Sequence, residues 1–306
     1  MERLGVPVAL YRMVSMRFRR SQLLTIRWIA VLLYVATLSS CFVRKRVVTL
    51  PGTPPSVHLL TATKEELIER VRRIADPLQS FSMRMNMSPS VGSVYVGEVK
   101  DYATLGGYIL FRKPDAIRVL AQDPVVSNTV VDMVSLGDTF QVHIPSKNRF
   151  IVGRNDTTPH SKNQLENLRP VAFLTSLIVE APDSTRDIVL LEEDTTERES
   201  VYILLTIRRD AKEPWLVRTL HFDRRDLNIV RQKTYDSSGN VLSDTRYSDW
   251  KPYDGNPFPT AIDIKRPQDH YEVMLNVISL RENPADVTPD KFILNQPPGT
   301  DLQQLP

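Results

Sequence analysis

The 306-residue sequence offers few side chains for catalysis, with one cysteine and five histidines. The histidines are scattered, at His58, His143, His160, His221 and His270. No His-Glu-x-x-His pair, Gly-x-Ser-x-Gly turn or phosphate-binding glycine loop occurs in the sequence. The acidic cluster of Glu192, Glu193, Asp194 and Glu197 is more typical of a solvated hairpin end than of a cation site. These patterns predict that the chain is not an enzyme and that it has no metal and no cofactor.

The single thiol, Cys41, stands where a lipidation site would stand. Residues 1–40 contain six arginines and one acid, and the uncharged run from Trp28 to Leu38 is 11 residues long. A helix needs about 20 residues to cross a bilayer, so this run predicts a cleaved signal peptide. Leu38-Ser39-Ser40-Cys41 resembles the lipobox of bacterial lipoproteins, which implies acylation of the thiol with palmitate-like chains. The alternative is a signal-anchored protein whose cysteine is incidental.

The leader also accounts for the basic composition. The whole chain carries a charge of +3 and the leader alone carries +5, so the remainder carries −2. This balance predicts no nucleic-acid partner. Because the charged segment is long, Met13 and Met16 are alternative starting residues. With Cys41 acylated, no thiol remains for an internal disulfide.

Composition divides the chain into four parts. Residues 1–40 are the predicted signal peptide, and residues 41–62 are the lipidated cysteine with a proline-containing flexible tether. Residues 63–295 are predicted to form a single domain, and residues 296–306 a C-terminal tail. We expect the protein to be a monomer held on a membrane through lipidated Cys41.

Two segments have helical signals. Thr63-Lys64-Glu65-Glu66 has the form of a capping box, and apolar residues then follow at helical spacing until Pro77. A second helix is predicted from Ser161 to about residue 179, with Pro170 either kinking it or starting its main part.

The remaining domain has a period of two with frequent turn residues, which predicts strands. The predicted strands are 81–88, 93–100, 104–112, 115–122, 128–136, 139–145, 148–153, 186–192, 200–208, 215–222, 227–235, 241–248, 260–266 and 270–281. The fold class is therefore mainly β (α+β), with a large curved antiparallel sheet or open barrel and few helices.

Several short motifs are similar to those of the LolA/LolB superfamily of periplasmic lipoprotein carriers and outer-membrane lipoprotein receptors. They are Gly106 to Val119, Val134 to Asp138, Pro145 to Asn148, Tyr235 to Gly239 and Phe258 to Ile264. The resemblance implies an unclosed half-barrel sheet, lidded by helices, with a hydrophobic cavity for acyl chains of lipoproteins. Because the receptor branch is itself lipid-anchored, Cys41 points to the LolB-like branch.

The resemblance also suggests which residues bind ligand. The predicted cavity residues are Leu67, Val71, Ile74, Phe81, Met83, Met85, Ile109 and Phe111. An ordinary packed core is the alternative explanation of these residues.

Two further sites come from the same comparison. Receptors carry an exposed leucine on a loop that corresponds here to residues 123–128, so Pro124, Val125 and Val126 are the predicted membrane-inserting residues. The alternative is that both valines pack inward. Carriers hold their lid with an arginine before a proline, which makes Arg112 and Lys113 the gate candidates, although lysine cannot form the same bidentate bonds.

These features predict a non-enzymatic, lipid-anchored protein of the bacterial envelope. We expect it to face the periplasm from the outer membrane, accept acyl chains of lipoproteins or similar amphiphiles from a periplasmic LolA-like carrier, and deliver them to that membrane. The alternative is an envelope sensor or scaffold that uses the same fold to bind a partner protein. A hydrolase of envelope lipids is the third hypothesis, and no residue pattern supports it.

Overall fold

A computed structural model describes residues 44–45, 58–93, 97–155, 170–196, 199–209, 212–253 and 255–305. The predicted signal peptide, Cys41, most of the tether and residues 161–169 of the second predicted helix lie outside the described residues. By its contacts the chain divides into Met1–Arg44 and Lys45–Pro306. Apart from Arg44 in strand β1 (Arg44–Lys45), all described residues belong to the second unit.

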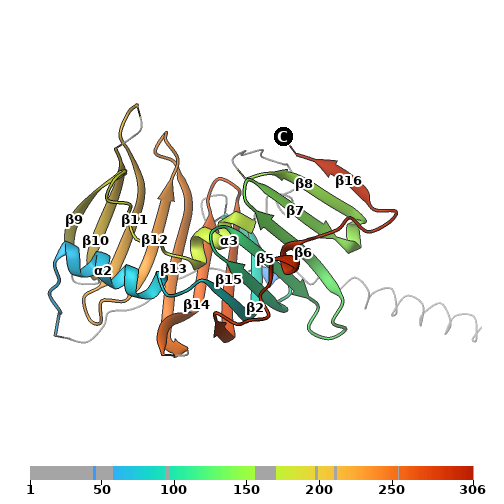
Figure 1. The fold of residues 1–306 in the computed structure, drawn as a ribbon, viewed down its shortest axis with the longest axis horizontal. Coiled ribbons are helices and arrows are strands. Elements are labelled where there is room, and N and C mark those ends of the chain that lie inside the picture. The colour runs from blue at the N-terminus through green and yellow to red at the C-terminus, as the bar shows by residue number, and fades with distance from the viewer. Residues whose placement is uncertain are drawn as a thin grey trace, which may run out of the picture. The chain divides into compact units, whose positions relative to one another are not determined.

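The second unit is built on one extended, mainly antiparallel sheet (Figure 1). Its strands are β2 (Ser80–Ser93), β3 (Glu98–Asp101), β4 (Leu105–Arg112), β5 (Ala116–Gln122), β6 (Thr129–Leu136), β7 (Thr139–Ile144), β8 (Arg149–Arg154), β9 (Asp187–Thr195), β10 (Ser200–Arg208), β11 (Trp215–Asp223), β12 (Ile229–Tyr235), β13 (Val241–Tyr253), β14 (Asn256–Arg266), β15 (Tyr271–Glu282) and β16 (Asp301–Gln304). The helices are α2 (Lys64–Ala75) and α3 (Pro170–Leu177), with short 3-10 turns η1 (Pro145–Lys147) and η3 (Pro289–Phe292).

The sheet is open. Its hydrogen-bonded order is β16-β8-β7-β6-β5-β4-β2-β15-β14-β13-β12-β11-β10-β9, and the two edge strands, β16 and β9, do not pair with each other. Most neighbours in this order are joined by short hairpins, and β2 pairs with β15 where the first and last parts of the domain meet. The predicted mainly-β class with an unclosed sheet is confirmed.

Most predicted strands lie within two residues of the observed ones, and the exceptions have local causes. Strand β2 runs on to Ser93, so β3 begins only at Glu98. Strands β13 and β14 extend beyond the predicted limits into a proline-rich stretch. Proline is unfavourable within a sheet because it lacks an N–H to donate. Here, however, Pro252 lies opposite Pro257 and Pro259 lies opposite Trp250 in the antiparallel register of the two strands.

Two segments at the limits of the domain also differ from their predicted roles. Residues 301–304 of the predicted tail form β16, which pairs in parallel with β8. At the other limit, Leu60 of the predicted tether contacts the turn after β11. The Leu60 N–H donates to the Arg224 carbonyl at 2.7 Å, and Arg224 Nε donates to the Leu60 carbonyl at 3.2 Å.

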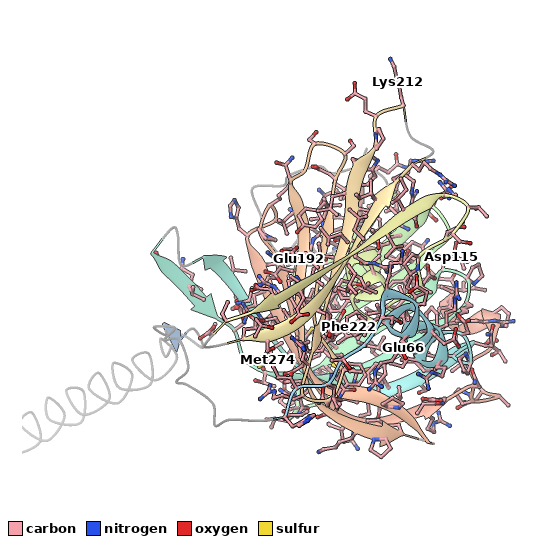
Figure 2. All side chains as sticks on the ribbon, turned by 90° about the vertical axis from the view of Figure 1, so that its left-hand side faces the viewer. Glu66, Asp115, Glu192, Lys212, Phe222 and Met274 are labelled. Atoms are coloured by element: carbon pink, nitrogen blue, oxygen red, sulfur yellow. The ribbon has the colours of Figure 1, made fainter. Side chains whose placement is uncertain are left out.

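Helix α2 begins with the predicted capping box. The Thr63 hydroxyl accepts the Glu66 N–H at 3.3 Å, and the Glu66 carboxylate accepts the Thr63 N–H at 2.7 Å. The buried face of the helix carries Leu67 and Val71, which belong to the same core cluster as Phe222 of β11. Phe222 is completely buried in the interior, whereas Glu66 lies on the exposed side of α2 (Figure 2).

Replacing Thr63 with alanine is expected to lower the free energy of unfolding by about 1 kcal/mol, because the Glu66 N–H in the first turn loses the hydroxyl oxygen that accepts it. Urea unfolding of the purified protein measures this change. Thr61→Ala, at an exposed position before the helix, serves as the control and should change stability by much less. Equal effects of the two substitutions would contradict a stabilising cap.

Helix α3 lies over the concave side of the sheet, between the two halves of its strand order (Figure 1). It packs against β5 and β6 on one side and β13 on the other. The Tyr247 hydroxyl donates to the Ser176 carbonyl at 2.7 Å, and the Thr245 hydroxyl donates to the Ser176 hydroxyl oxygen at 3.0 Å. Burial raises the pKa of Tyr247, so its phenol stays protonated as a donor. These bonds fix α3 against β13. Among the described residues, neither helix is both long and apolar enough to span a membrane.

Candidate functional site

The predicted cavity residues lie mainly in the packed core. Leu67, Phe81, Met83, Met85 and Ile109 are fully buried in one hydrophobic cluster. The other three border empty space. Val71 and the half-buried Ile74 line a gap of about 30 Å³ between α2, α3 and β12–β14, and Phe111 lines a much larger cavity.

The large cavity has a volume of about 820 Å³ and lies between α3 and the inner face of the sheet. This volume is in the range of about 300–1,000 Å³ that is usual for ligand sites. Its apolar wall comes mainly from α3 and the residues after it. The apolar lining residues include Phe111, Val171, Ala172, Leu174, Ile178 and Ala181.

The opposite wall of the cavity is polar. Thr206, Arg218 and Thr234 are direct neighbours across β10, β11 and β12, because the strand register pairs Thr206 with Arg218 and Arg218 with Thr234. Gln232, one pleat further along β12, also lines the cavity. We refer to Thr206, Arg218, Gln232 and Thr234 as the polar row. The cavity is therefore amphipathic rather than uniformly hydrophobic.

Unsatisfied hydrogen-bonding atoms concentrate at this cavity. Among the described residues, seven buried side-chain atoms have no hydrogen-bond partner, and four of them belong to residues that line it. These four are Asn155 Oδ1, Thr206 Oγ1, Arg218 Nε and Gln232 Oε1. Buried polar groups are normally paired, so the cavity has the hydrogen-bonding capacity to bind a polar ligand or water.

Arg218 is the charged residue of the polar row. Part of its surface faces the empty space, yet protein surrounds it so closely that burial lowers its pKa. Nearby Tyr247, Glu180 and Asp187 favour the charged form. Among the described residues, no hydrogen bond or ion pair joins any of the three to Arg218. Asp187 pairs instead with Arg208 at 2.8 Å, the Tyr247 hydroxyl donates to Ser176, and Glu180 is exposed. The guanidinium remains protonated, since an arginine pKa starts at about 12.5 or higher.

Ion pairs flank the polar row. Arg208 of β10 pairs with Asp187 of β9, and Arg266 of β14 pairs with Asp269 at 2.8 Å. All four of these residues line the cavity. No histidine, cysteine or serine is among the lining residues in the described part of the chain. Elsewhere too, the described residues contain no group of three His, Cys, Asp or Glu side chains arranged to hold a metal.

Among the histidines that the structure describes, His221, on the same strand as Arg218, has the largest pKa shift. Burial, together with the nearby positive charges of Arg231 and Lys233, lowers its pKa to about 4. The unfolded chain binds the proton more readily, at a pKa of about 6.5, so this residue destabilises the fold as the pH drops from 6.5 towards 4. Burial and Glu272 raise the pKa of Asp263 to about 6, and this residue works in the opposite direction over nearly the same interval.

His221→Gln is expected to reduce the loss of stability between pH 7 and pH 5 by about 1 kcal/mol, after a discount for partial exposure of the side chain. Urea unfolding of variant and wild type at both pH values measures the difference. The contribution of Asp263 is common to both proteins and cancels. An unchanged pH dependence in the variant would contradict the assigned shift.

The gate candidates differ in what they contact. Lys113 Nζ donates to the carbonyls of Ala75 and Asp76 at 2.9 and 3.3 Å, at the C-terminal end of α2. A lysine at this position also complements the helix dipole. For Arg112, no hydrogen bond to either helix is found among the described residues. Lys113 thus holds the end of α2, and a gating role for either residue stays a prediction.

The predicted membrane-inserting loop is held by hydrogen bonds to Asp123 and exposes its valines. Asp123 Oδ1 accepts the N–H groups of Val125 and Val126 at 2.8 and 3.0 Å. These bonds lower the pKa of Asp123, so the carboxylate that orders the loop is charged at neutral pH. Val125 is 88% exposed and Val126 62% exposed. The inward-packed alternative therefore does not apply, although neither valine lines the large cavity.

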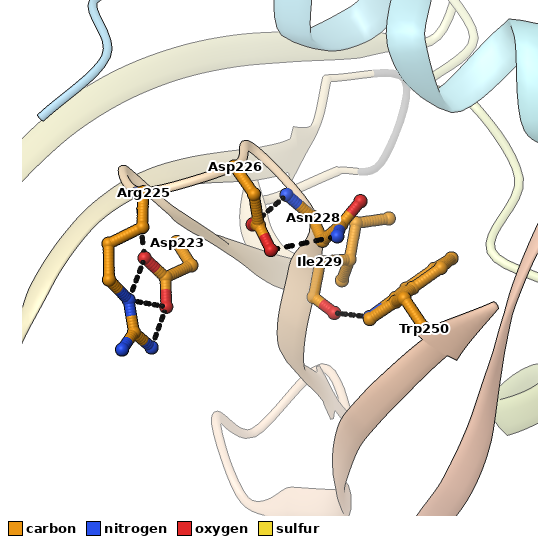
Figure 3. A network of polar contacts seen from close by, with 6 residues as sticks. All are labelled: Asp223, Arg225, Asp226, Asn228, Ile229 and Trp250. Atoms are coloured by element: carbon orange, nitrogen blue, oxygen red, sulfur yellow. Dashed lines mark hydrogen bonds and ion pairs between the residues drawn. The ribbon is translucent and has the colours of Figure 1, made fainter.

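A second turn shows that this loop geometry does not require apolar residues. In residues 223–228 the Asp223 N–H donates to the Asn228 carbonyl at 2.9 Å, as the Asp123 N–H does to the Asn128 carbonyl. Here the side chains form a polar network: Arg225 pairs with Asp223, and Asn228 Nδ2 donates to the Asp226 carboxylate at 2.9 Å (Figure 3). The exposed valines are thus a property of the first loop's sequence rather than of its backbone.

The polar row was not predicted from the sequence. The alternation of side chains along the strand does indicate it. Arg218 lies on the same face of its strand as the buried Leu220 and Phe222, so a charged residue falls on the buried face of a predicted strand. Thr206 has the same relation to Tyr202 and Leu204 on β10.

The fold and cavity define a class: an open, helix-covered antiparallel sheet with an amphipathic internal space. No family model matches the sequence, and no curated protein matches it. Among solved structures, the chain is similar to a DUF1329 family protein from Desulfovibrio piger, with 17% identity, a TM-score of 0.50, and coverage of 74% of this chain and 96% of that one.

Two further structures match at lower TM-scores. A LolA superfamily protein from Nitrosomonas europaea has 17% identity and a TM-score of 0.46, covering 76% of this chain and 99% of that one. A putative outer membrane lipoprotein-sorting protein domain from Vibrio parahaemolyticus has 15% identity and a TM-score of 0.47, covering 74% and 94%. A LolA superfamily protein is therefore among the solved structures to which the chain is similar, as the sequence motifs led us to expect.

Proposed function

We propose that the protein is a lipid-anchored envelope protein that holds the acyl part of a lipoprotein or a similar amphiphile in the cavity beneath α3 and delivers it to the outer membrane. The observation that carries this proposal is the 820 Å³ cavity, which has apolar α3 side chains on one wall and the polar row on the other. Burying each methylene contributes about 0.8 kcal/mol, so such a space can replace the bilayer for a chain in transit.

The anchor is the second part of the proposal. Cys41 would be acylated after cleavage of the leader, which would keep the cavity near the membrane. The exposed valines of residues 123–128 would contact that membrane during delivery, because two exposed aliphatic side chains on an ordered loop are favourable at a bilayer surface.

The test combines Cys41→Ala with membrane fractionation and mass spectrometry of retained lipid. The wild-type full chain should fractionate with membranes, and the variant should appear in the soluble fraction while still carrying acyl lipid. A variant that stays on the membrane would contradict the anchor, and a soluble variant free of lipid would contradict the binding role. Retention of a protein partner in place of lipid would favour an envelope sensor or scaffold.

A further inference from the structure

Arg218 presents an unusual electrostatic situation. It is an enclosed cation with no ion-pair partner among the described residues, and its Nε has no hydrogen-bond partner. Removing a charge from water without pairing it is costly, and arginine does not avoid the cost by losing its proton. Two other arginines that line the cavity, Arg208 and Arg266, each have a carboxylate at 2.8 Å. Arg218 alone among these three faces the cavity with its charge uncompensated at short range.

The neighbours of Arg218 complete a polar site. Thr206, directly across on β10, is 2% exposed and its hydroxyl has no partner, so it can donate to the same group as the guanidinium. Gln232 is 1% exposed; its amide N–H donates to the Thr175 carbonyl at 2.7 Å, which leaves Oε1 free to accept from a hydroxyl or amide. Two donors, one of them charged, and one acceptor therefore meet beside an apolar wall.

We propose that the polar row binds the anionic group, a carboxylate or a phosphate, of an amphiphile whose chain lies against α3. This inference deepens the proposed function and rests on it, because it names the class of ligand that the cavity takes. The anion supplies the counter-charge that Arg218 lacks, and a planar guanidinium suits both carboxylate and phosphate geometry. A neutral amphiphile would leave the buried cation unpaired and would bind more weakly.

The test uses two photoactivatable probes with the same diazirine-bearing C16 chain, a fatty acid and the corresponding fatty alcohol, added to membranes containing the full chain. Labelled peptides are mapped by mass spectrometry. In the wild type, labelling of α3 by the acid should exceed labelling by the alcohol by about 30-fold or more, because the alcohol leaves the buried charge of Arg218 without a partner. Excess inorganic phosphate should not prevent this labelling.

Arg218→Met should bring acid labelling down to the alcohol level. Arg246→Met removes the same charge from an exposed position on β13 and should label as the wild type does. Arg218→Met should also raise the unfolding temperature by about 2 °C or more, because an uncompensated buried charge is lost. If this variant does not fold, the ratio of acid labelling to alcohol labelling in the wild type tests the anionic site by itself.

The contrary results separate the two proposals. Equal labelling of α3 by both probes would overturn the anionic site while leaving acyl binding intact. Labelling by neither probe would refute acyl binding in this cavity and with it the proposed function. Full competition by inorganic phosphate would contradict an amphiphile as the ligand of the polar row and would show that the row binds a free anion.

Discussion

Leu174→Trp is expected to reduce the acyl lipid retained by the full chain to about a tenth or less of the wild-type amount. Leu174 is a half-buried residue of α3 that lines the large cavity. An indole at this position would fill part of the space that the acyl chain is proposed to occupy. Inserting extra volume against a packed surface costs about 1–3 kcal/mol, which corresponds to a loss of affinity of roughly fivefold to 150-fold when the ligand must be displaced. Mass spectrometry of lipid extracted from equal amounts of protein measures the loss.

The matched control is Leu190→Trp. Leu190 is 50% exposed on edge strand β9 and does not line the cavity, so the same substitution should leave the retained lipid unchanged. Lipid retained equally by Leu174→Trp and the wild type would show that the chain does not occupy this space.

Val125→Glu is expected to slow the transfer of acylated cargo from the protein to lipid vesicles by about tenfold or more, without loss of folding. Burying a valine contributes about 1.5 kcal/mol, roughly a factor of ten, and the new carboxylate resists entry into the membrane. Because Val125 is 88% exposed, its replacement removes little internal packing. The transfer rate to vesicles and a thermal unfolding curve are measured on the same preparation.

Leu136→Glu controls for a new acid at another exposed aliphatic residue. Leu136 is 52% exposed at the end of β6, in a different turn. Transfer should proceed normally in this variant. If Val125→Glu transfers cargo as fast as Leu136→Glu, the loop has no inserting role.

The strand and helix pattern could be predicted because it is encoded locally. The capping box at Thr63 and the strand alternation act over a few residues, and the structure reproduces both. Strand β16 could not be predicted in this way, because residues 301–304 are a strand only through their parallel partner β8, some 150 residues earlier. The pairing of β2 with β15 is likewise a long-range contact that no local period reports.

The existence of a cavity could be predicted from the sequence, but its position and its polar wall could not. Apolar residues such as Met83 and Phe81 indicate burial, and the sequence does not distinguish a filled core from an empty space. The cavity depends on α3 being held above the polar row by the Tyr247 and Gln232 bonds, which join residues more than fifty positions apart. The exposure of Val125 was one of two open alternatives, because the loop's direction depends on how Asp123 orders it.

Site-specific crosslinking to the bound ligand tests the central claim most directly. A photoreactive benzoylphenylalanine is placed at Val171, which lines the cavity, and separately at the exposed Leu190. After irradiation of the full chain in its native membranes, the Val171 position should carry the mass of an acyl lipid or acylated peptide, and the Leu190 position should not. Equal lipid adducts at both positions, or none at Val171, would contradict an acyl-binding cavity beneath α3.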